Sequence, residues 1–426
     1  MASGWVQSDP APLSSRALRR VLSSTLPEVT EYLALALSGA VDREPDWDEM
    51  EWRIARAVAV IHGISPLLSQ RLSWHGNTGW RAFLEAQRVH TAVRYRRMAA
   101  LLDAISLQAA ASGIGLVPLK GAALHALNIY QAGDRPMADI DLLVQPQDLP
   151  AMNRLLTELG YRSIVITPNE HILVPVAPSS HSHLAEHSDN PITIELHATI
   201  SQSMPVRRVD ITPDLWTACP RPGRNEYPSR SALMSHLLMH VAVNMQVHEV
   251  RMLQLHDIAL LAPRLSAAEW RAVLQPGDGR AIPWWSMPPL HLVRRYYPSA
   301  IPKEIVKTAE RGCPALLKIA APHLRLADVS VANARQPVFP ALMWAGSVTE
   351  TLYWMGRRLT RGARALAGGA GLPEATEIKP WITRPHRRRA LELLLGRPRP
   401  ETMMMISAAL AGNPAFAASY EQPNAA

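Results

Sequence analysis

The sequence predicts an α+β fold in which a small sheet lies between two helical regions. Apolar residues recur at helical spacing over residues 14–112. Short stretches rich in apolar and β-branched residues, separated by turn signals, follow between residues 115 and 200. Helical spacing returns over residues 229–262. At 426 residues the chain exceeds the usual size of one domain, so we expect several substructures.

The helical region that opens the chain is expected to cover residues 1–113. Apolar residues from Trp52 to Ile61 form one helical stripe, and the stretch 80–111 is long, periodic and free of Gly and Pro. This stretch also carries an arginine cluster that we expect to be a solvated helix face on a scaffold helix: Arg94, Arg96 and Arg97.

The central region, residues 114–228, begins with an apolar strand and a turn at Lys120-Gly121. A helix over 122–130 should follow, and then a strand that begins with Asp139-Ile140-Asp141. Beyond it we expect a helix over 147–159 that Gly160 ends. Strands over 163–167, 172–176 and 192–200 complete this region, with a polar loop over 179–191.

The two aspartates suggest a cation site. Side chains of a strand alternate between faces, so Asp139 and Asp141 should point to one side while Ile140 and Leu142 face the core. Two carboxylates at that spacing repel each other unless a cation lies between them, and oxygen ligands suit Mg²⁺ or Mn²⁺. The turn at Lys120-Gly121 leaves backbone N–H groups free at a helix start, where a phosphate can bind.

An ordered set of motifs between about residues 45 and 265 resembles an uncharacterised nucleotidyltransferase family of the polymerase-beta-like superfamily. The set runs from His62-Gly63-Ile64-Ser65-Pro66 through Lys120-Gly121, Arg135 and Asp139-x-Asp141 to Leu159-Gly160-Tyr161 and Glu195-Leu196-His197. The resemblance implies a small catalytic sheet over 114–228, in which a carboxylate on a neighbouring strand completes the metal site. That carboxylate would be Glu195.

The resemblance also implies a reaction. Asp139, Asp141 and Glu195 would be catalytic and would bind Mg²⁺ or Mn²⁺, while the nucleotide would contact Lys120, Gly121, Arg135 and His197. The enzyme would move a nucleoside monophosphate from a nucleoside triphosphate (NTP) to a hydroxyl group on an unknown acceptor and release pyrophosphate. Small molecules and peptide natural products are among the acceptors that the resemblance allows.

Several residues admit a second interpretation. Lys120 is either a phosphate contact or a solvated strand-end residue, Arg135 could form an ion pair with Asp134 or Glu195, and Glu195 could be an exposed strand residue. His197 could be a structural histidine. Arg251 and Asp257 either line the nucleotide cleft or pair with each other. Two histidine groups have zinc-like features but lack a nearby cysteine, so we do not expect zinc: His181, His183 and His187, and His236 and His240.

Two rival functions stay open. The first is an RNA-directed or toxin-like nucleotidyltransferase, since residues 357–399 hold 11 Lys or Arg against 3 acidic residues and could contact phosphates. That segment accounts for the whole net charge of +8. The second rival is a non-catalytic nucleotide-binding or partner-binding module, suggested by Ala122 where the superfamily often has Gly or Ser.

The rest of the chain sets broader expectations. Residues 229–340 should form a helical domain, with a helical hairpin over 229–262, and residues 341–426 a basic segment whose tail is disordered from Pro414. Two cysteines form no disulfide framework, and neither a signal peptide nor an apolar run of about 18 residues is evident. We therefore expect a cytoplasmic protein without a membrane span.

Overall fold

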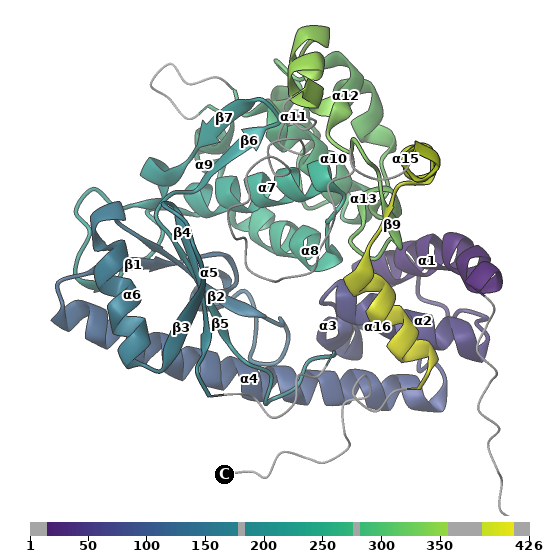
Figure 1. Ribbon diagram of the computed structural model, residues 1–426, viewed down its shortest axis with the longest axis horizontal. Helices are drawn as coiled ribbons and strands as arrows, with labels where there is room; N and C mark the ends of the chain where they lie inside the picture. The colour runs from purple at the N-terminus through teal and green to yellow at the C-terminus, as the bar shows by residue number, and fades with distance from the viewer. Residues whose placement is uncertain (1–14, 178–183, 276–281, 357–385, 413–426) are drawn as a thin grey trace, which may run out of the picture.

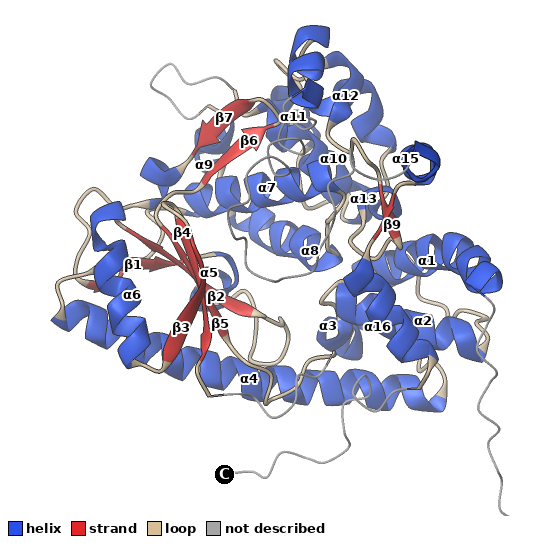
Figure 2. Cartoon of the chain, viewed as in Figure 1, coloured by secondary structure: helices blue, strands red, loops and turns tan. Residues whose placement is uncertain are grey.

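The computed structural model describes residues 15–177, 184–275, 282–356 and 386–412. A sheet lies on one side, a group of helices lies above it, and the long helix α4 runs beneath both the sheet and the N-terminal helices (Figure 1). The cartoon coloured by secondary structure shows the strands gathered between helices (Figure 2). The α+β prediction is confirmed.

The N-terminal helices follow the predicted stripes. They are α1 (Ser15–Ser38), α2 (Glu49–Ile61), α3 (Ser65–Arg71) and α4 (Thr78–Ala111). Helix α2 begins at Asp48, whose side chain accepts from the backbone N–H of Glu51 while the Glu51 side chain accepts from the Asp48 N–H. This reciprocal capping satisfies two N–H groups that a helix start leaves without partners.

The main sheet has six strands in the order β3-β4-β5-β2-β1-β8. Their bounds are β1 (Gly115–Pro118), β2 (Asp139–Val144), β3 (Tyr161–Ile166), β4 (Glu170–Pro175), β5 (Thr193–His197) and β8 (Gly223–Arg224). Strand β2 pairs antiparallel with β1 and parallel with β5, so it lies inside the sheet. Strands β6 (Ser201–Met204) and β7 (Arg207–Asp210) form a separate hairpin.

Both faces of strand β2 are buried, against different helices. Ile140 and Leu142 pack with residues of α4 and of α6 (Leu149–Glu158), as the alternation predicted. Leu143 belongs to the larger core, which includes α7 (Arg230–Val247) and α8 (Met252–Leu261). The aspartates share the face of Leu143, so they point toward the helical hairpin that the sequence predicted over 229–262.

The segments between these elements are short. Helix α5 spans Lys120–Ala126, so it begins earlier and ends earlier than the expected helix over 122–130. Gly160 has a φ of +86° after α6, as a glycine that ends a helix requires. The helices after α8 include α9 (Ala267–Leu274), α10 (Met287–Tyr296), α11 (Lys303–Ala309), α12 (Ala315–Ala320), α13 (Leu326–Val329), α15 (His386–Leu395) and α16 (Pro400–Leu410).

One expectation for α4 is wrong. Arg94 does not lie on a solvated face, because only 4% of its surface is exposed and its guanidinium donates to four backbone carbonyls. Arg96 is exposed as expected. Helical periodicity separates the two residues, since positions two apart on a helix point to different sides.

Some expectations fall on residues that the structure does not describe. Most of the basic segment 357–399, the tail from Pro414 and the histidines His181 and His183 lie outside the described residues. Within the described part of the chain, no helix has the length and apolar character needed to cross a bilayer. Cys219 and Cys313 are both free thiols.

Candidate active site

The candidate site is built on the parallel pair of strands β2 and β5. Their register places Asp139 beside Thr193, Asp141 beside Glu195, and Leu143 beside His197. Because residues directly opposite in a sheet point to the same side, Asp141 and Glu195 are neighbours across the ladder. The sequence-predicted carboxylates are thus on one face of two adjacent strands.

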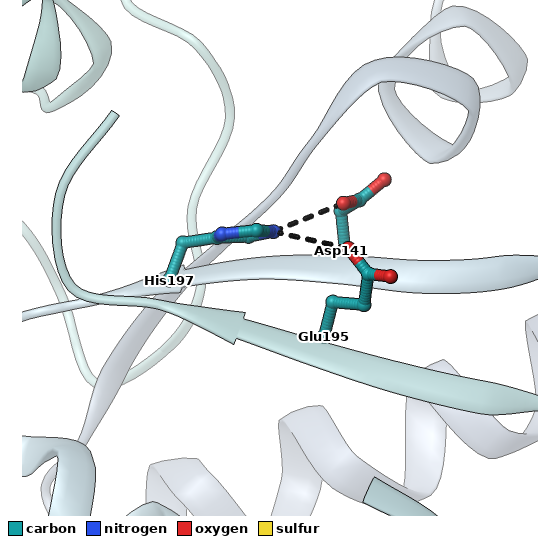
Figure 3. Close-up of side chains that lie close together, drawn as sticks. All are labelled: Asp141, Glu195 and His197. Atoms are coloured by element: carbon teal, nitrogen blue, oxygen red, sulfur yellow. Dashed lines mark hydrogen bonds and ion pairs between the residues drawn. The ribbon is translucent and has the colours of Figure 1, made fainter. Parts of the chain in front are cut away.

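Three side chains converge there (Figure 3). One ligand atom from each of Asp141, Glu195 and His197 lies within 4.8 Å of the others. His197 Nε2 is 3.0 Å from Asp141 Oδ1 and 3.7 Å from Glu195 Oε2. Asp139 stands outside this group, at the first position of β2, although it lines the same cleft.

Lys120 contacts this group directly. Its ammonium Nζ lies 2.9 Å from Asp141 Oδ1, the same oxygen that His197 approaches. Lys120 has a φ of +46°, which is uncommon for a residue with a side chain. Since Oδ2 takes part in neither contact, Lys120 and His197 orient the carboxylate and leave its second oxygen for another ligand.

The carboxylates differ in their electrostatic state. Burial would raise the pKa of Asp141, but Lys120 and His197 together lower it below its usual range. Burial and then repulsion from Asp141 raise the pKa of Asp139. Burial, followed by repulsion from Asp141 and Asp139, raises the pKa of Glu195 to about 7. The site thus concentrates more negative charge than the surrounding cations balance.

These residues fit a divalent cation. The raised pKa values of Asp139 and Glu195 reflect burial first and then repulsion between neighbouring carboxylates, and a bound cation would offset both effects. The donor set combines carboxylate oxygens with one imidazole nitrogen. Carboxylate oxygens suit Mg²⁺ and Mn²⁺, which agrees with the expected cofactor.

The carboxylates open onto a cleft of about 1240 Å³ between the sheet and the helices. Its walls include Asp139, Asp141 and Glu195 from the sheet, together with α5, α7, the start of α8 and residues 397–402. Ligand pockets in proteins usually measure about 300–1,000 Å³. The cleft therefore has room for a nucleotide and part of a second molecule.

Arg135, expected to contact phosphate, lines the cleft and is paired with Asp257. Its Nε and Nη2 donate to Asp257 Oδ1 and Oδ2 over 2.9 and 2.7 Å, and Tyr130 Oη donates to the same carboxylate over 2.8 Å. A Cβ on Gly121 would come within 2.3 Å of Arg135 Nη1 and 2.7 Å of Met137 Sδ. Gly121 is thus required for the close approach of Arg135, independently of any phosphate.

Arg251 lines the cleft, and the sequence allows it either a contact with the nucleotide or a pairing with Asp257. It does not pair with Asp257, which Arg135 occupies. Its backbone is fixed, because its N–H donates to Gln254 Oε1 over 3.0 Å and the next N–H, of Met252, donates to His62 Nδ1 over 3.0 Å. Its side chain is exposed, lines the cleft and lowers the pKa of Asp139.

The contacts of His62 give a structural reason for the motif over residues 62–66. Besides Met252, it contacts Ser330 Oγ through Nε2 at 3.1 Å, and its carbonyl accepts from Leu253 N–H over 3.2 Å. Gly63 follows with a φ of +68°. The motif joins the end of α2 to the start of α8, and so it sets where Arg251 enters the cleft.

The described histidines of the two zinc-like groups contact other partners. His236 Nδ1 lies 2.7 Å from Tyr227 Oη, and His240 Nε2 lies 2.9 Å from Gln254 Nε2. His187 stacks on His90 with ring centroids 4.4 Å apart. The described residues contain one cluster of three or more potential metal ligands, and Asp141, Glu195 and His197 form it.

Comparison with known proteins agrees with this geometry. Residues 48–279, more than half of the chain, match the model of a family described as an uncharacterised nucleotidyltransferase. No curated protein and no solved structure gives a match. The matched segment begins just before α2 and extends past α9, so it contains the carboxylates, the Lys120 turn and the helical hairpin.

Proposed function

Because the chain belongs to this family of uncharacterised nucleotidyltransferases, we propose that its cleft transfers a nucleoside monophosphate from an NTP to a hydroxyl group, using Mg²⁺ or Mn²⁺. The observation that carries the proposal is the placement of Asp141 directly beside Glu195 on adjacent strands, with Asp139 on the same face of β2. Three carboxylates facing one cleft are the donor set that this chemistry needs.

Each carboxylate has a separate role in the proposed reaction. When bound, the divalent cation would neutralise charge on the α-phosphate and on the departing pyrophosphate. Asp139 and Asp141 would hold the cation, and Glu195 would be a further ligand on the side of the acceptor hydroxyl. The acceptor oxygen forms a bond to the α-phosphorus, the bond to the β-phosphate oxygen breaks, and the hydroxyl proton passes to Glu195 or to water. Transfer then depends on positioning and charge neutralisation.

Arg251 is proposed as the residue that contacts the triphosphate. Five other described cations line the cleft, and each has a partner: Lys120 pairs with Asp141, Arg135 with Asp257 and Arg224 with Asp103, Arg399 donates to backbone carbonyls of 247 and 248, and Arg397 is also engaged. Arg251 has no recorded side-chain partner among the described residues, and its backbone is fixed by contacts on both sides of the residue. A planar guanidinium matches the geometry of phosphate oxygens.

The proposal gives supporting roles to three residues near the carboxylates: Lys120, Gly121 and His197. Lys120 and His197 hold the Oδ1 atom of Asp141, so that Oδ2 remains directed to the cation. Residues that hydrogen-bond to ligating carboxylates fix the ligand geometry in the same way. Gly121 lets Arg135 pass close to α5 and reach Asp257. These roles support the catalytic carboxylates without requiring contact with the nucleotide.

The test uses NTPs labelled at the α-phosphate. The wild-type protein is titrated with each of the four NTPs in Mg²⁺, in Mn²⁺ and in EDTA. It is then incubated with a small-molecule cell extract while pyrophosphate release and label transfer are followed. We expect cation-dependent NTP binding and label transfer to an acceptor. Absence of cation-dependent binding would overturn the proposal, whereas binding without transfer would favour a non-catalytic module.

A further inference from the structure

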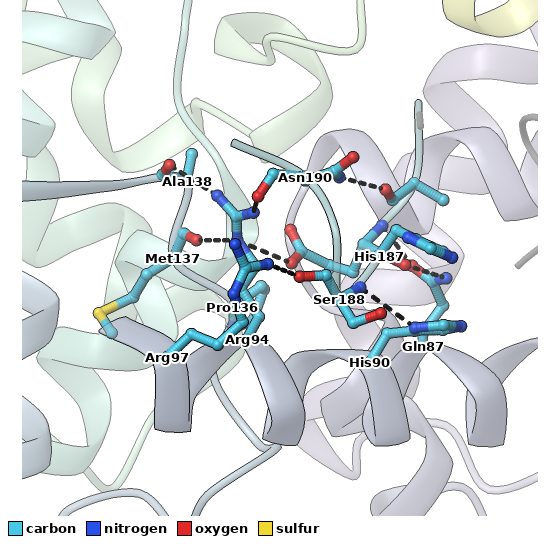
Figure 4. Close-up of polar contacts among 12 residues, drawn as sticks. Gln87, His90, Arg94, Arg97, Pro136, Met137, Ala138, His187, Ser188 and Asn190 are labelled. Carbon is cyan, nitrogen blue, oxygen red and sulfur yellow. Dashed lines mark hydrogen bonds and ion pairs between the residues drawn. The ribbon is translucent and has the colours of Figure 1, made fainter. Parts of the chain in front are cut away.

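We propose that Arg94, near the middle of α4, is a positioning residue that fixes the geometry of the cation-binding carboxylates. It does so by tying together the two chain segments that enter strands β2 and β5 (Figure 4). This inference rests on the proposed function, because the effect of Arg94 is exerted on the proposed cation site.

One guanidinium makes all the contacts. Arg94 Nε donates to the carbonyl of Met137 over 3.0 Å, and Nη2 donates to the carbonyl of Ala138 over 2.8 Å. Nη2 also donates to the carbonyl of Pro191 over 2.9 Å, and Nη1 to that of Asn190 over 2.6 Å. The first two carbonyls immediately precede Asp139, and the other two lie just before β5 begins.

The buried charge of Arg94 has few other partners. Its side chain is 5% exposed, and Glu186 Oε2 lies 3.8 Å from Nε. Four carbonyl oxygens take up four of the five N–H donors of the planar guanidinium. Burying a charge is costly unless its donors are satisfied, so the two segments are held at the spacing that the guanidinium fork requires.

Arg94 belongs to a polar face of α4 that follows the loop before β5. Gln87 exchanges hydrogen bonds with the backbone of Glu186, at 3.1 and 2.9 Å, and His90 Nδ1 accepts from Ser188 N–H over 3.2 Å. Arg97 donates to the carbonyl of Ser188. Spacings of three, four and three residues place these four side chains on one side of the helix. Of these four side chains, Arg94 hydrogen-bonds both to the segment before β2 and to the segment before β5 (Figure 4).

The position of Asp139 makes this contact important for the site. Asp141 is held in the sheet from both sides, since its carbonyl accepts from Leu119 N–H over 2.9 Å and its register pairs it with Glu195. Asp139 pairs with Thr193 but is the first residue of β2, so the pairing of that strand does not extend to residues 137 and 138. Its orientation toward Glu195 therefore depends on residues 137 and 138, which Arg94 holds.

The test replaces Arg94 by lysine and measures cation binding without any NTP. Mn²⁺ is titrated into the protein, and free Mn²⁺ is counted by electron paramagnetic resonance, alongside thermal unfolding. Lysine keeps the charge but has one nitrogen and no planar fork, so it cannot span four carbonyls. We expect Arg94→Lys to bind Mn²⁺ about 10-fold or more weakly, the scale seen when groups that orient metal ligands are lost. Its unfolding should remain cooperative.

Gln87→Ala provides the matched control. Gln87 is on the same face of α4 and is fully buried, but its recorded contacts are to Glu186 and not to residues 137–138 or 190–191. We expect this variant to lose thermal stability while its Mn²⁺ affinity stays within about two-fold of wild type, because a purely structural defect does not move the cation affinity of folded molecules. Equal loss of Mn²⁺ affinity in both variants would overturn a special role for Arg94.

A second variant tests the inference if Arg94→Lys does not fold. Arg94→Met/Glu186→Met removes both charges of the buried pair together, so that neither is left buried without its partner, while the four carbonyls still lose their donor. It should show the same loss of Mn²⁺ affinity. Folded variants that bind Mn²⁺ like wild type would overturn this inference and leave the proposed function intact. A wild-type protein that binds no Mn²⁺ would overturn both.

Discussion

The Asp257 carboxylate holds the Arg135 guanidinium in a two-pronged ion pair, with Nε–Oδ1 and Nη2–Oδ2 separations of 2.9 and 2.7 Å. Both side chains are buried, at 10% and 2% exposed. The pair joins the segment before β2 to helix α8 and so connects the two walls of the cleft. Its role is therefore to hold the sheet against the helical hairpin.

Asp257→Asn is expected to destabilise the fold by about 3–5 kcal/mol, because it leaves the buried Arg135 charge without its counter-ion. Urea unfolding followed by circular dichroism measures this loss. Arg207→Gln, which removes one partner of the surface pair with Glu350, is the control and should change stability by less than about 1 kcal/mol. Full stability of Asp257→Asn combined with weakened NTP binding would instead return Arg135 to a phosphate-contact role.

Arg251→Ala should weaken NTP binding about 10-fold or more without changing the unfolding temperature. A charge-assisted hydrogen bond is worth about 1.5–3 kcal/mol, and the Arg251 side chain is exposed, so its removal disturbs no packing. Fluorescent NTP titration in Mg²⁺ measures the affinity. Arg264→Ala, on the same helical unit, serves as control because its guanidinium donates to the carbonyls of 127 and 128. Unchanged affinity in Arg251→Ala would exclude it as the triphosphate contact.

Asp139→Asn and Asp141→Asn should both abolish cation-dependent transfer but differ in stability. Asp141 accepts from Lys120 and His197, so its neutral replacement leaves a partly buried ammonium poorly compensated. Asp139 has a raised pKa, so neutralising it removes repulsion and should maintain or increase stability. Thermal unfolding together with pyrophosphate release checks both effects. Near-normal turnover in either variant would contradict the assignment of the cation ligands.

Local sequence pattern predicted the elements of the site well. Alternation in the DIDLLV stretch placed the two aspartates opposite Ile140 and Leu142, and the structure confirms that arrangement. The turn glycine at 160 and the helical hairpin were predicted from short-range signals of the same kind. The pairing of β2 with β5 came instead from family resemblance, because local alternation does not specify which strands are neighbours.

The contacts that local pattern missed join distant segments. Arg135 and Asp257 are separated by 122 positions, and no spacing rule connects them. The arginine cluster predicts a solvated face for Arg94, because charge alone does not distinguish it from Arg96 and Arg97. The signal that would have separated Arg94 from Arg96 is the spacing of Gln87, His90, Arg94 and Arg97, which repeats at helical intervals along one face. Charge clusters on helices are better interpreted face by face.

His62 should make stability depend on pH. Burial and then the charge of Arg251 lower its pKa to about 3, so the folded protein keeps it neutral where the unfolded chain, at about 6.5, takes up a proton. Its stabilising contribution is therefore complete above pH 6.5 and is lost as the pH falls toward 3.

His62→Asn is the variant that isolates this effect, since an asparagine oxygen can still accept from Met252 N–H while it cannot titrate. At pH 7.5 we expect the variant to be about 1 kcal/mol less stable than wild type because the Ser330 contact is lost. At pH 5 wild type should have lost about 2 kcal/mol that the variant keeps, because only the wild-type unfolded chain gains from protonation at this position, so the order should reverse and the variant should be about 1 kcal/mol more stable. Urea unfolding at both pH values measures it, and parallel pH curves would contradict the assignment.

Glu195→Gln separates binding from chemistry. Glu195 lies beside Asp141 across the ladder, and the proposed role places it on the acceptor side of the reaction. The variant should therefore bind NTP and Mg²⁺ within a few-fold of wild type but lose about 10²-fold or more in transfer rate, the scale of a positioned acid–base group. Nucleotide titration and single-turnover kinetics on the same preparation give both quantities. An exposed strand residue without a role would change neither, whereas lost NTP affinity in a folded variant would move Glu195 to the triphosphate side of the site.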